Sequence, residues 1–321
     1  MLAVGIQGSP RKKGNSEILL SLFMEALAGK GMQTRILPVV DLHVEPCKEL
    51  TVCEKKGFCP IEDLMSREIY GLLRQADIVV VASPVFFYNV TAQLKAFIDR
   101  CQTLWARRYM LKLKDPGSGT RRGFLLAVGA TGGKQLFDGM HLTLKYFFDA
   151  LGAGYSGSLT YRGIEGRGQI KSHPTVEADV ARAATELAAG LRERTKVLFV
   201  CRENACRSQM AAAFARFHGG SRFDAASAGS QPAAQVNSDM VQVMAEKGID
   251  LGFVVPRSLD AALAQGMPDK VIAMGCGDLC PAAPGADHLE WRIPDPASQS
   301  LDVMRSARDE IEKRVLAFLD Q

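Results

Sequence analysis

Two cysteines and an arginine stand close together in the stretch VLFVCRENACRSQMA, residues 197–211. Cys201 follows four apolar residues typical of a buried strand, and Arg207 opens a stretch typical of a helix. Between a strand and a helix, successive backbone N–H groups and the helix N-terminus attract an anion. Arg207 can bind two oxygens of an oxyanion, and the same field favours the thiolate of Cys201. The pattern predicts a nucleophilic cysteine in an oxyanion loop, steadied by Asn204 and Ser208.

The spacing of Cys201 and Arg207 is weak support on its own, because Cys101 and Arg107 in CQTLWAR have the same spacing. That second pair lies at the end of a helix-like stretch, with no strand before it and no turn of glycine or small residues. The prediction for Cys201 therefore depends on its context between a strand and a helix.

A second pair of cysteines lies in MGCGDLCPAAPG, residues 274–285, after the strand-like run KVIAM. A two-electron reduction needs two thiols that finish as a disulfide, and Cys276 and Cys280 are spaced for that role. A CxxxC pair is also half of a zinc site, but zinc needs two further ligands and this half of the sequence offers His218 and His288 alone. We therefore expect thiol chemistry here and no metal site.

Another loop with anion-binding residues lies near the start of the chain. GSPRKKGNSE separates the strand-like LAVGIQ from the amphipathic EILLSLFMEALAG, which is where N–H groups and a helix dipole hold a phosphate. The expected phosphate ligands are Ser9, Arg11, Asn15 and Ser16. The alternative is that this loop is a plain polar connection.

Two later loops favour the phosphate interpretation. SPVFFY at 83–88 and GATGG at 129–133 each follow a buried-looking strand, so in a parallel sheet they emerge at the same edge as the first loop. Together the three loops predict one crevice that binds a phosphate and a flat ring. The ring is expected to lie against Pro84, Val85 and Phe86, with Thr131 and Gly132 on its polar rim.

The elements that position these loops alternate between short apolar runs and helix-like stretches. This alternation predicts an α/β fold with parallel sheets, and 321 residues with 47% apolar composition suffice for two domains. The charged segment LRERTK at 191–196 precedes a new series of elements. We therefore expect domains at residues 1–193 and 194–321, each with three layers.

Charge and hydropathy limit which binding partners and which cellular location are expected for the protein. A formal net charge of +4 without a dense basic block gives no reason to expect nucleic acid as a partner. MLAVGIQGSP does not resemble a signal peptide, and no apolar run reaches the length of a membrane span. The eight cysteines are clustered, which indicates thiol chemistry more than a disulfide framework. The expected location is cytoplasmic, without membrane attachment.

Residues 1–190 resemble the NAD(P)H-dependent FMN reductase group of flavodoxin-like proteins, through GSPRKKGNS, ADIVVVASPVFFYNVTAQLKAFIDR and GATGG. The resemblance implies FMN and NAD(P)H as cofactors and a homo-oligomer, and it leaves NADPH against NADH open. A subgroup, the iron–sulfur flavoproteins, carries four cysteines before the segment written here as GFCPIEDLM. This chain has Cys47, Cys53 and Cys59, with Leu50 at the remaining position, so an iron–sulfur cluster is not expected. A redox-active thiol relay and inert packing are the alternatives for these cysteines.

Residues 196–321 resemble the low-molecular-weight tyrosine phosphatase fold and, within it, the thiol-dependent arsenate reductases. RSQMA, SAGS and VMAEKGIDL are similar to the arsenate reductases, although Ala212 replaces an acidic residue common there. Cys276 and Cys280 favour the same side, because a phosphatase has no use for them. The resemblance makes Asp295, in IPDPAS, the proton donor, and Cys206 is expected only to pack.

The combined prediction is an arsenate reductase in which Cys201, Cys276 and Cys280 form a thiol relay. NAD(P)H would reduce the final disulfide through FMN in the fused first half, directly or through Cys47, Cys53 or Cys59, whereas ordinary relatives use thioredoxin. Two alternatives remain: a tyrosine phosphatase under redox control by the flavin half, and an FMN-dependent quinone reductase with an oxyanion-binding appendage.

Overall fold

The computed structural model describes residues 1–275 and 283–321, and these residues form two compact units. Unit 1 consists of residues 1–111 and 120–192, and unit 2 consists of residues 112–119 and 193–321. Each unit is built on a wholly parallel sheet with helices around it, which confirms the predicted α/β fold class. Among the described residues, no helix combines the length and the apolar character needed to cross a membrane.

The sheet of unit 1 has the strand order β2-β1-β3-β4-β5, the order of a flavodoxin-like doubly wound sheet. The central strands β1 and β3 are buried along almost their whole length, as expected for strands covered on both faces. The five strands are β1 (Leu2–Gln7), β2 (Gln33–Pro38), β3 (Ile78–Pro84), β4 (Arg122–Val128) and β5 (Gly154–Tyr161).

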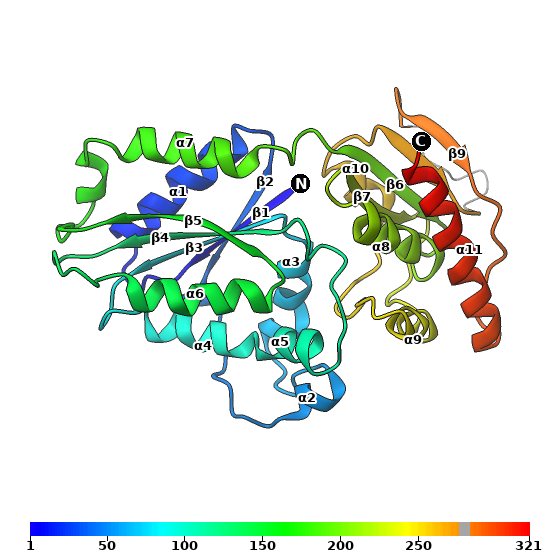
Figure 1. Cartoon of the computed structure of the whole chain (residues 1–321), viewed down its shortest axis with the longest axis horizontal. Helices are drawn as coiled ribbons and strands as arrows, with labels where there is room; N and C mark the ends of the chain where they lie inside the picture. Colours follow the sequence, from blue (N-terminus) through cyan, green and yellow to red (C-terminus); the bar gives the residue numbers. More distant parts are fainter. Residues whose placement is uncertain (276–282) are drawn as a thin grey trace. The chain divides into compact units, whose positions relative to one another are not determined.

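Helices cover both faces of this sheet. Helices α1 (Asn15–Ala28) and α7 (Val176–Ala188) pack together on one face, and α4 (Ala92–Arg100), α5 (Gln102–Tyr109) and α6 (Asp138–Ala150) lie on the other (Figure 1). The Phe23 ring of α1 stacks on Phe124 of β4 with the centroids 5.0 Å apart. Two short helices, α2 (Val52–Lys56) and α3 (Tyr70–Gln75), complete the unit, and the second follows a π-helical turn at Met65–Ile69.

The sheet of unit 2 has the order β7-β6-β8-β9. Its strands are β6 (Thr195–Cys201), β7 (Phe223–Gly229), β8 (Lys270–Ala273) and β9 (Asp287–Glu290). Helix α8 (Arg207–Gly219) is buried along most of its length between the sheet and α11 (Leu301–Leu319), and α9 (Ser238–Glu246) packs beside α11. The short helix α10 (Leu259–Leu263) contributes Ala262 to a smaller core that also contains Leu198 and Val271.

The strand predicted before Cys201 and the helix predicted to open at Arg207 are confirmed as β6 and α8. Strands β5 and β9 and helices α2 and α10 were not expected from the sequence. Most residues of β5 are half-buried or exposed, with only Tyr161 buried, and the four residues of β9 are all exposed, so neither has the apolar pattern of a buried strand.

Residues 112–119 were also assigned differently by sequence reasoning, which left them in the first domain. The structure groups them with unit 2, because Lys114 N donates to Gly248 O (2.7 Å) and Asp250 N donates to Lys114 O (2.8 Å). These two bonds form a parallel bridge between Lys114 and Ile249. Unit 2 is therefore not a continuous stretch of sequence.

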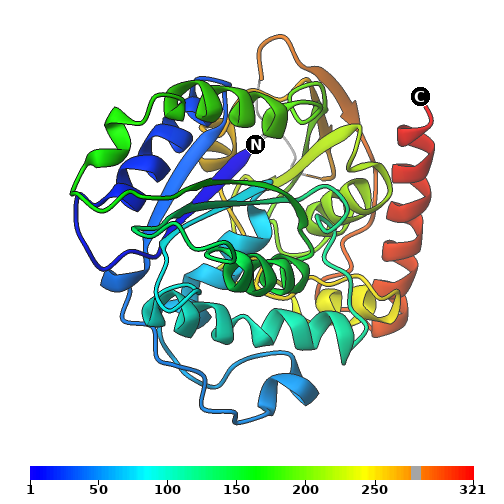
Figure 2. The same ribbon diagram turned by 60° about the vertical axis from the view of Figure 1, so that its left-hand side comes forward.

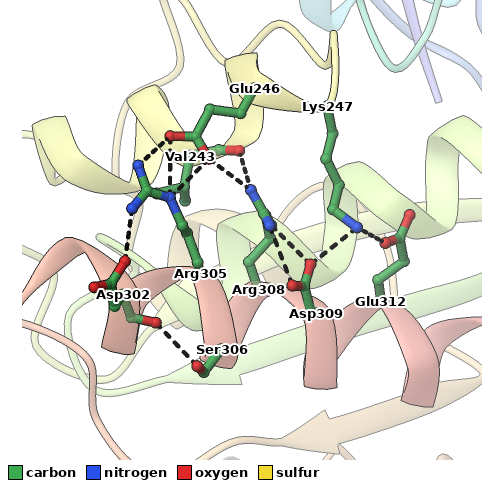
Figure 3. A network of polar contacts seen from close by, with 9 residues as sticks. All are labelled: Val243, Glu246, Lys247, Asp302, Arg305, Ser306, Arg308, Asp309 and Glu312. Atoms are coloured by element: carbon green, nitrogen blue, oxygen red, sulfur yellow. Dashed lines mark hydrogen bonds and ion pairs between the residues drawn. The ribbon is translucent and has the colours of Figure 1, made fainter.

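A network of ion pairs joins α9 and its C-terminal neighbour Lys247 to α11 (Figure 3). Glu246 pairs with Arg305 (2.7 Å) and Arg308 (3.0 Å), and Arg308 also donates to the buried Val243 carbonyl (2.8 Å). Lys247 contacts carboxylates of α11, among them Asp309 at 2.9 Å. Several charges share this surface, so the network fixes α9 against α11 more firmly than an isolated surface pair would.

Candidate functional site

The loop between β6 and α8 is organised around buried side chains that touch one another. Cys201, at the end of β6, is 2% exposed, and its Sγ lies 3.0 Å from Ser208 Oγ. Asn204 Nδ2 donates to the same hydroxyl (2.9 Å), and Asn204 Oδ1 accepts from Gln209 Nε2 (3.1 Å) and from the Arg257 N–H (2.9 Å). Asn204 has a left-handed backbone, with φ 52°, which asparagine tolerates better than most residues. The loop conformation is thus held by side chains inside it and behind it.

The carbonyl groups of this loop point to a second segment of unit 2, residues 230–237. Four of them accept a backbone hydrogen bond from that segment, whereas none of the backbone N–H groups of residues 203–208 donates to another residue in the described part of the chain. N–H groups without an acceptor at the N-terminus of a helix such as α8 are suited to attract an anion. The carbonyl contacts are Ser230 N to Cys201 O (3.2 Å), Gln231 N to Arg202 O (2.8 Å), Ala233 N to Glu203 O (2.9 Å) and Asn237 N to Ala205 O (3.1 Å).

Gly229 permits this close approach between the two segments. A Cβ atom at Gly229 would lie 2.8 Å from Arg202 O and 2.9 Å from the backbone N of Asn204. These are backbone atoms that cannot move without deforming the loop. The glycine of the SAGS sequence, a feature shared with the arsenate reductases, is therefore required because a side chain would not fit there.

Arg207 and Asp295 meet beside the loop. Arg207 Nη2 lies 2.6 Å from Asp295 Oδ2, and Nη1 donates to the Ile293 carbonyl (3.1 Å). The Arg207 side chain is 8% exposed and the Asp295 side chain is 54% exposed, so the carboxylate lies at the solvent side of the pair. The structure therefore brings together the predicted oxyanion-binding arginine and the predicted proton donor, which are 88 residues apart in sequence.

Of the other three cysteines of this unit, the structure describes one, Cys206. Cys206 is 5% exposed, and burial raises the pKa of its thiol to about 12, with the negative charges of Asp295 and Cys201 adding to that effect. Cys206 is thus a poor nucleophile at neutral pH. Cys276 and Cys280 lie outside the described residues. Within the described part of the chain, no group of three or more His, Cys, Asp or Glu side chains is arranged to hold a metal ion.

Unit 1 contains a cavity of about 450 Å³ at the carboxyl edge of its sheet. The loop after β1 forms one side, the loop after β3 another, and the end of β4 closes it. Its lining is polar near the N-terminus of α1, where the first-turn N–H groups have no intrahelical acceptor, and apolar near Val85, Val128 and Ile164. This combination fits a phosphate joined to a flat apolar ring, and the volume lies within the usual range for cofactor pockets.

Most residues predicted for the flavin lie in this cavity. Thr131 and Gly132 are exposed and do not line it, although their neighbour Ala130 does. Asn15 lines the cavity, but its amide also joins the loop to the Gly166 carbonyl (2.8 Å). The predicted residues in the lining are Ser9, Arg11, Asn15, Ser16, Pro84, Val85 and Phe86, and the lining also contains Pro10, Gly14, Val128, Ala130, Ile164 and Glu165.

A tight turn after β3 presents aromatic side chains beside the cavity. Phe86 and Asn89 exchange backbone hydrogen bonds of 2.8 and 2.9 Å, and the two residues between them, Phe87 and Tyr88, have φ values of 47° and 60°. Left-handed geometry at both central positions defines a type I′ turn, which normally carries asparagine and glycine. The turn keeps Phe86 in the cavity wall while Phe87 is fully exposed.

The segment that carries Cys47, Cys53 and Cys59 is closed at its base by Arg100. The Arg100 guanidinium is completely buried and donates to Asp63 (2.5 and 3.1 Å), to Glu45 O (2.8 Å) and to Ile61 O (3.4 Å). One side chain therefore holds the chain both before the first of these cysteines and after the last. None of the three lines the cavity.

The Asp63–Arg100 pair gives a prediction for stability and its pH dependence. Burial alone would raise the pKa of Asp63, but hydrogen bonds from Arg100 and the Glu45 N–H lower it. A lowered carboxyl pKa contributes stability above the ordinary pKa of 3.8 and loses it as the pH falls through the lowered value. Asp63→Asn should destabilise unit 1 by ~3 kcal/mol at pH 7. Urea unfolding of both proteins should show this difference shrinking toward pH 3; a difference constant with pH would contradict the prediction.

Known proteins match the two halves of the chain separately. The profile of the family described as NADPH-dependent FMN reductase matches residues 1–161, and that of low molecular weight phosphotyrosine protein phosphatase matches residues 196–321. An iron–sulfur flavoprotein of Methanosarcina thermophila is 36% identical over 149 residues, which are 44% of this chain and 74% of that protein. An arsenate reductase of Halalkalibacterium halodurans is 36% identical over 134 residues, 39% of this chain and 94% of that protein.

The match to the flavoproteins is partial. An iron–sulfur flavoprotein of Methanocaldococcus jannaschii is 35% identical over 137 residues, and the chain spans 66% of its length and 42% of its own. The similarity therefore identifies the kind of domain in each half, and the activity of the whole chain has to be argued from its site.

Proposed function

Because the first half of the chain belongs to the NADPH-dependent FMN reductase family and the second half to the low molecular weight phosphotyrosine protein phosphatase family, we propose that it is an arsenate reductase with its own flavin-dependent electron supply. The chain is an oxidoreductase, since a reductase family covers its first half and arsenate reductases are among the relatives of its second. We assign flavin binding to residues 1–193 and arsenate chemistry to residues 194–321.

The observation that carries the proposal is the loop at residues 201–208. It combines a buried cysteine held by Ser208, a row of N–H groups with no acceptor among the described residues, and an arginine paired with a carboxylate. Arsenate is a tetrahedral oxyanion whose oxygens match these donors. Tyrosine phosphate has the same shape, so the loop alone supports both chemistries, and the cysteines at 276 and 280 favour arsenate.

In the first step, the Cys201 thiolate attacks arsenic, an As–S bond forms and one As–O bond breaks. The Ser208 hydroxyl, 3.0 Å from the sulfur, donates to the thiolate and keeps it aimed at the N–H groups of the loop. An arsenate oxygen and the Asp295 carboxylate would share the Arg207 guanidinium, and a proton held between them relieves their repulsion. Asp295 gives that proton to the departing oxygen, which leaves as water.

In the second step, Cys276 attacks the sulfur of Cys201. An S–S bond forms, the As–S bond breaks, and its electron pair stays on arsenic, which leaves as arsenite with arsenic reduced from +5 to +3. Cys280 then attacks Cys276, which frees Cys201 and leaves a Cys276–Cys280 disulfide. Each turnover therefore consumes two electrons, which must be returned before the next.

The residues around the cavity of unit 1 are suited to hold FMN. Ser9, Arg11 and Ser16, with the N–H groups at the start of α1, would bind its phosphate, and Pro84 and Val85 would pack against its ring. When bound, FMN would accept a hydride from NAD(P)H and supply two electrons for the disulfide. The lining residues Val128 and Ile164 exclude water from the apolar end of the cavity.

The proposal is tested by offering the FMN-loaded protein arsenate, an aryl phosphate and a quinone in parallel. An arsenate reductase should form arsenite, and Cys276→Ser should stop it. Aryl phosphate hydrolysis that survives Cys276→Ser and Cys280→Ser would favour the redox-controlled phosphatase instead. Quinone reduction that persists in Cys201→Ser, with no arsenite formed by the unchanged protein, would favour the quinone reductase.

A further inference from the structure

The guanidinium of Arg207 fills the space that a side chain at Gly275 would need. A Cβ atom at Gly275 would lie 2.8 Å from Arg207 Nη1, which is too close unless one of the two groups moves. Gly275 also has a φ of +79°, in the left-handed region that glycine adopts without steric cost. Both the backbone conformation of this residue and its surroundings therefore require glycine.

The backbone at Gly275 is poorly placed to move away from the arginine, because the residue before it is anchored. Met274 N donates to Val200 O (2.7 Å), and the Met274 side chain is fully buried in the core that also contains Cys201. In the register of β6 and β8, Val200 pairs with Ala273, so the next residues along the two strands, Cys201 and Met274, are level with each other. Gly275 therefore follows at the carboxyl edge of the sheet, beside the loop of the nucleophile.

Arg207 is the more movable partner of this contact, and other segments of unit 2 hold it in place. Its Nη1 donates to the Ile293 carbonyl (3.1 Å) and its Nη2 lies 2.6 Å from Asp295 Oδ2, both in the segment before α11. Helix α8, which begins at Arg207, lies between the sheet and α11 (Figure 2). These bonds use two of the five N–H groups of the guanidinium, and the other three have no acceptor among the described residues. Donors therefore remain for an oxyanion.

We propose that Gly275 is a positioning residue of the oxyanion site, because its missing side chain leaves the Arg207 guanidinium where it can bind an oxyanion beside Asp295. A side chain at residue 275 would push Nη1 away from the Ile293 carbonyl and turn the planar group, whose fixed fork of donors decides how it meets an oxyanion. The inference rests on the proposed function for the identity of the substrate, arsenate. Inorganic phosphate is tetrahedral as well and is bound by the same donors, so it serves as the probe.

Phosphate binding tests the proposal without turnover. Isothermal titration calorimetry is carried out on the reduced, FMN-loaded full chain, in which the phosphate of FMN would occupy the anion site of unit 1. Gly275→Ala should weaken phosphate binding by roughly 10- to 100-fold, the range expected for loss of a hydrogen bond to a charged group. A lack of arsenite formation in the unchanged protein would leave this result intact. Normal phosphate binding by the Gly275 variants would overturn the inference and leave the proposed function standing.

Two variants separate the contact with Arg207 from backbone strain. Gly285→Ala is the matched control, because Gly285 also has a left-handed backbone, with φ +85°, but no described residue beyond its chain neighbours comes within 4 Å of its Cβ position. It should leave phosphate binding unchanged. Gly275→Asn reduces the strain, since asparagine tolerates the left-handed region, yet it still adds a Cβ atom. It should weaken phosphate binding as much as Gly275→Ala does, and it carries the test if Gly275→Ala folds poorly.

Arg207→Lys shows whether Gly275 acts through the arginine. Lysine carries a single ammonium group and has no atom equivalent to Nη1. Adding Gly275→Ala to Arg207→Lys should therefore weaken phosphate binding much less than adding it to the unchanged chain, the non-additive result expected for two residues in contact. A merely structural glycine would give equal losses in both backgrounds. Equal losses, or a loss of the same size in Gly285→Ala, would overturn the proposal.

Discussion

Cys201→Ser should abolish arsenite formation, by roughly 10⁴-fold or more, because loss of a covalent nucleophile removes the whole reaction path and not one contact. NAD(P)H oxidation with a small artificial acceptor should be unchanged in the same variant, since the flavin cavity lies in unit 1. Arsenite is measured directly, by separating it from arsenate.

Cys206→Ala is the matched control, because Cys206 lies in the same loop, is equally buried, and has a pKa raised to about 12. It should retain arsenite formation within about tenfold. The assignment of the nucleophile would be wrong if Cys206→Ala lost activity while Cys201→Ser kept it.

Cys280→Ser should limit the enzyme to a single round of reduction. Cys276 can still release arsenite by attacking Cys201, but the resulting disulfide then blocks the nucleophile. The prediction is one arsenite per chain in a rapid first phase, followed by a loss of steady-state turnover of 10²-fold or more, an order-of-magnitude expectation for a residue that acts in sequence with others. Arsenite is counted against protein concentration with excess NADPH.

Cys276→Ser is the companion variant and should release no arsenite even in the first round. The different stoichiometries separate the two roles, because a merely structural cysteine would lower both phases together. Full steady-state turnover by Cys280→Ser would contradict the relay.

Local patterns in the sequence were sufficient for the site loops. The apolar run VLFV predicted the strand before Cys201, and the stretch opened by Arg207 predicted the helix after it, because a buried parallel strand and a helix N-terminus have distinct residue requirements. The phosphate loop was found in the same way, and the residues predicted there line the cavity except for Thr131 and Gly132. Those two were predicted from the loop GATGG as a whole, but after β4 ends at Val128 it is Ala130 that lines the cavity, whereas Thr131 and Gly132 are exposed.

Contacts between distant parts of the sequence could not be predicted. Arg100 reads as the polar end of an amphipathic helix, and only the fold shows that Asp63 meets it in the core. In the sequence, Gly229 looks like an ordinary residue at the end of a strand. Only the structure shows that it lies against the backbone of Arg202 and Asn204. The bridge between Lys114 and Ile249 is made by backbone groups, which every residue has, so no sequence pattern predicts it.

The central claim, that one chain carries both the arsenate chemistry and its electron supply, is tested most directly by NADPH oxidation. The purified, FMN-loaded protein is kept anaerobic, with no thioredoxin or glutathione, and NADPH oxidation is followed with and without arsenate. The account predicts oxidation that depends on arsenate and yields one arsenite per NADPH. Oxidation that ignores arsenate, with arsenite formed only when thioredoxin and its reductase are added, would contradict it and leave the flavin unit without the proposed role.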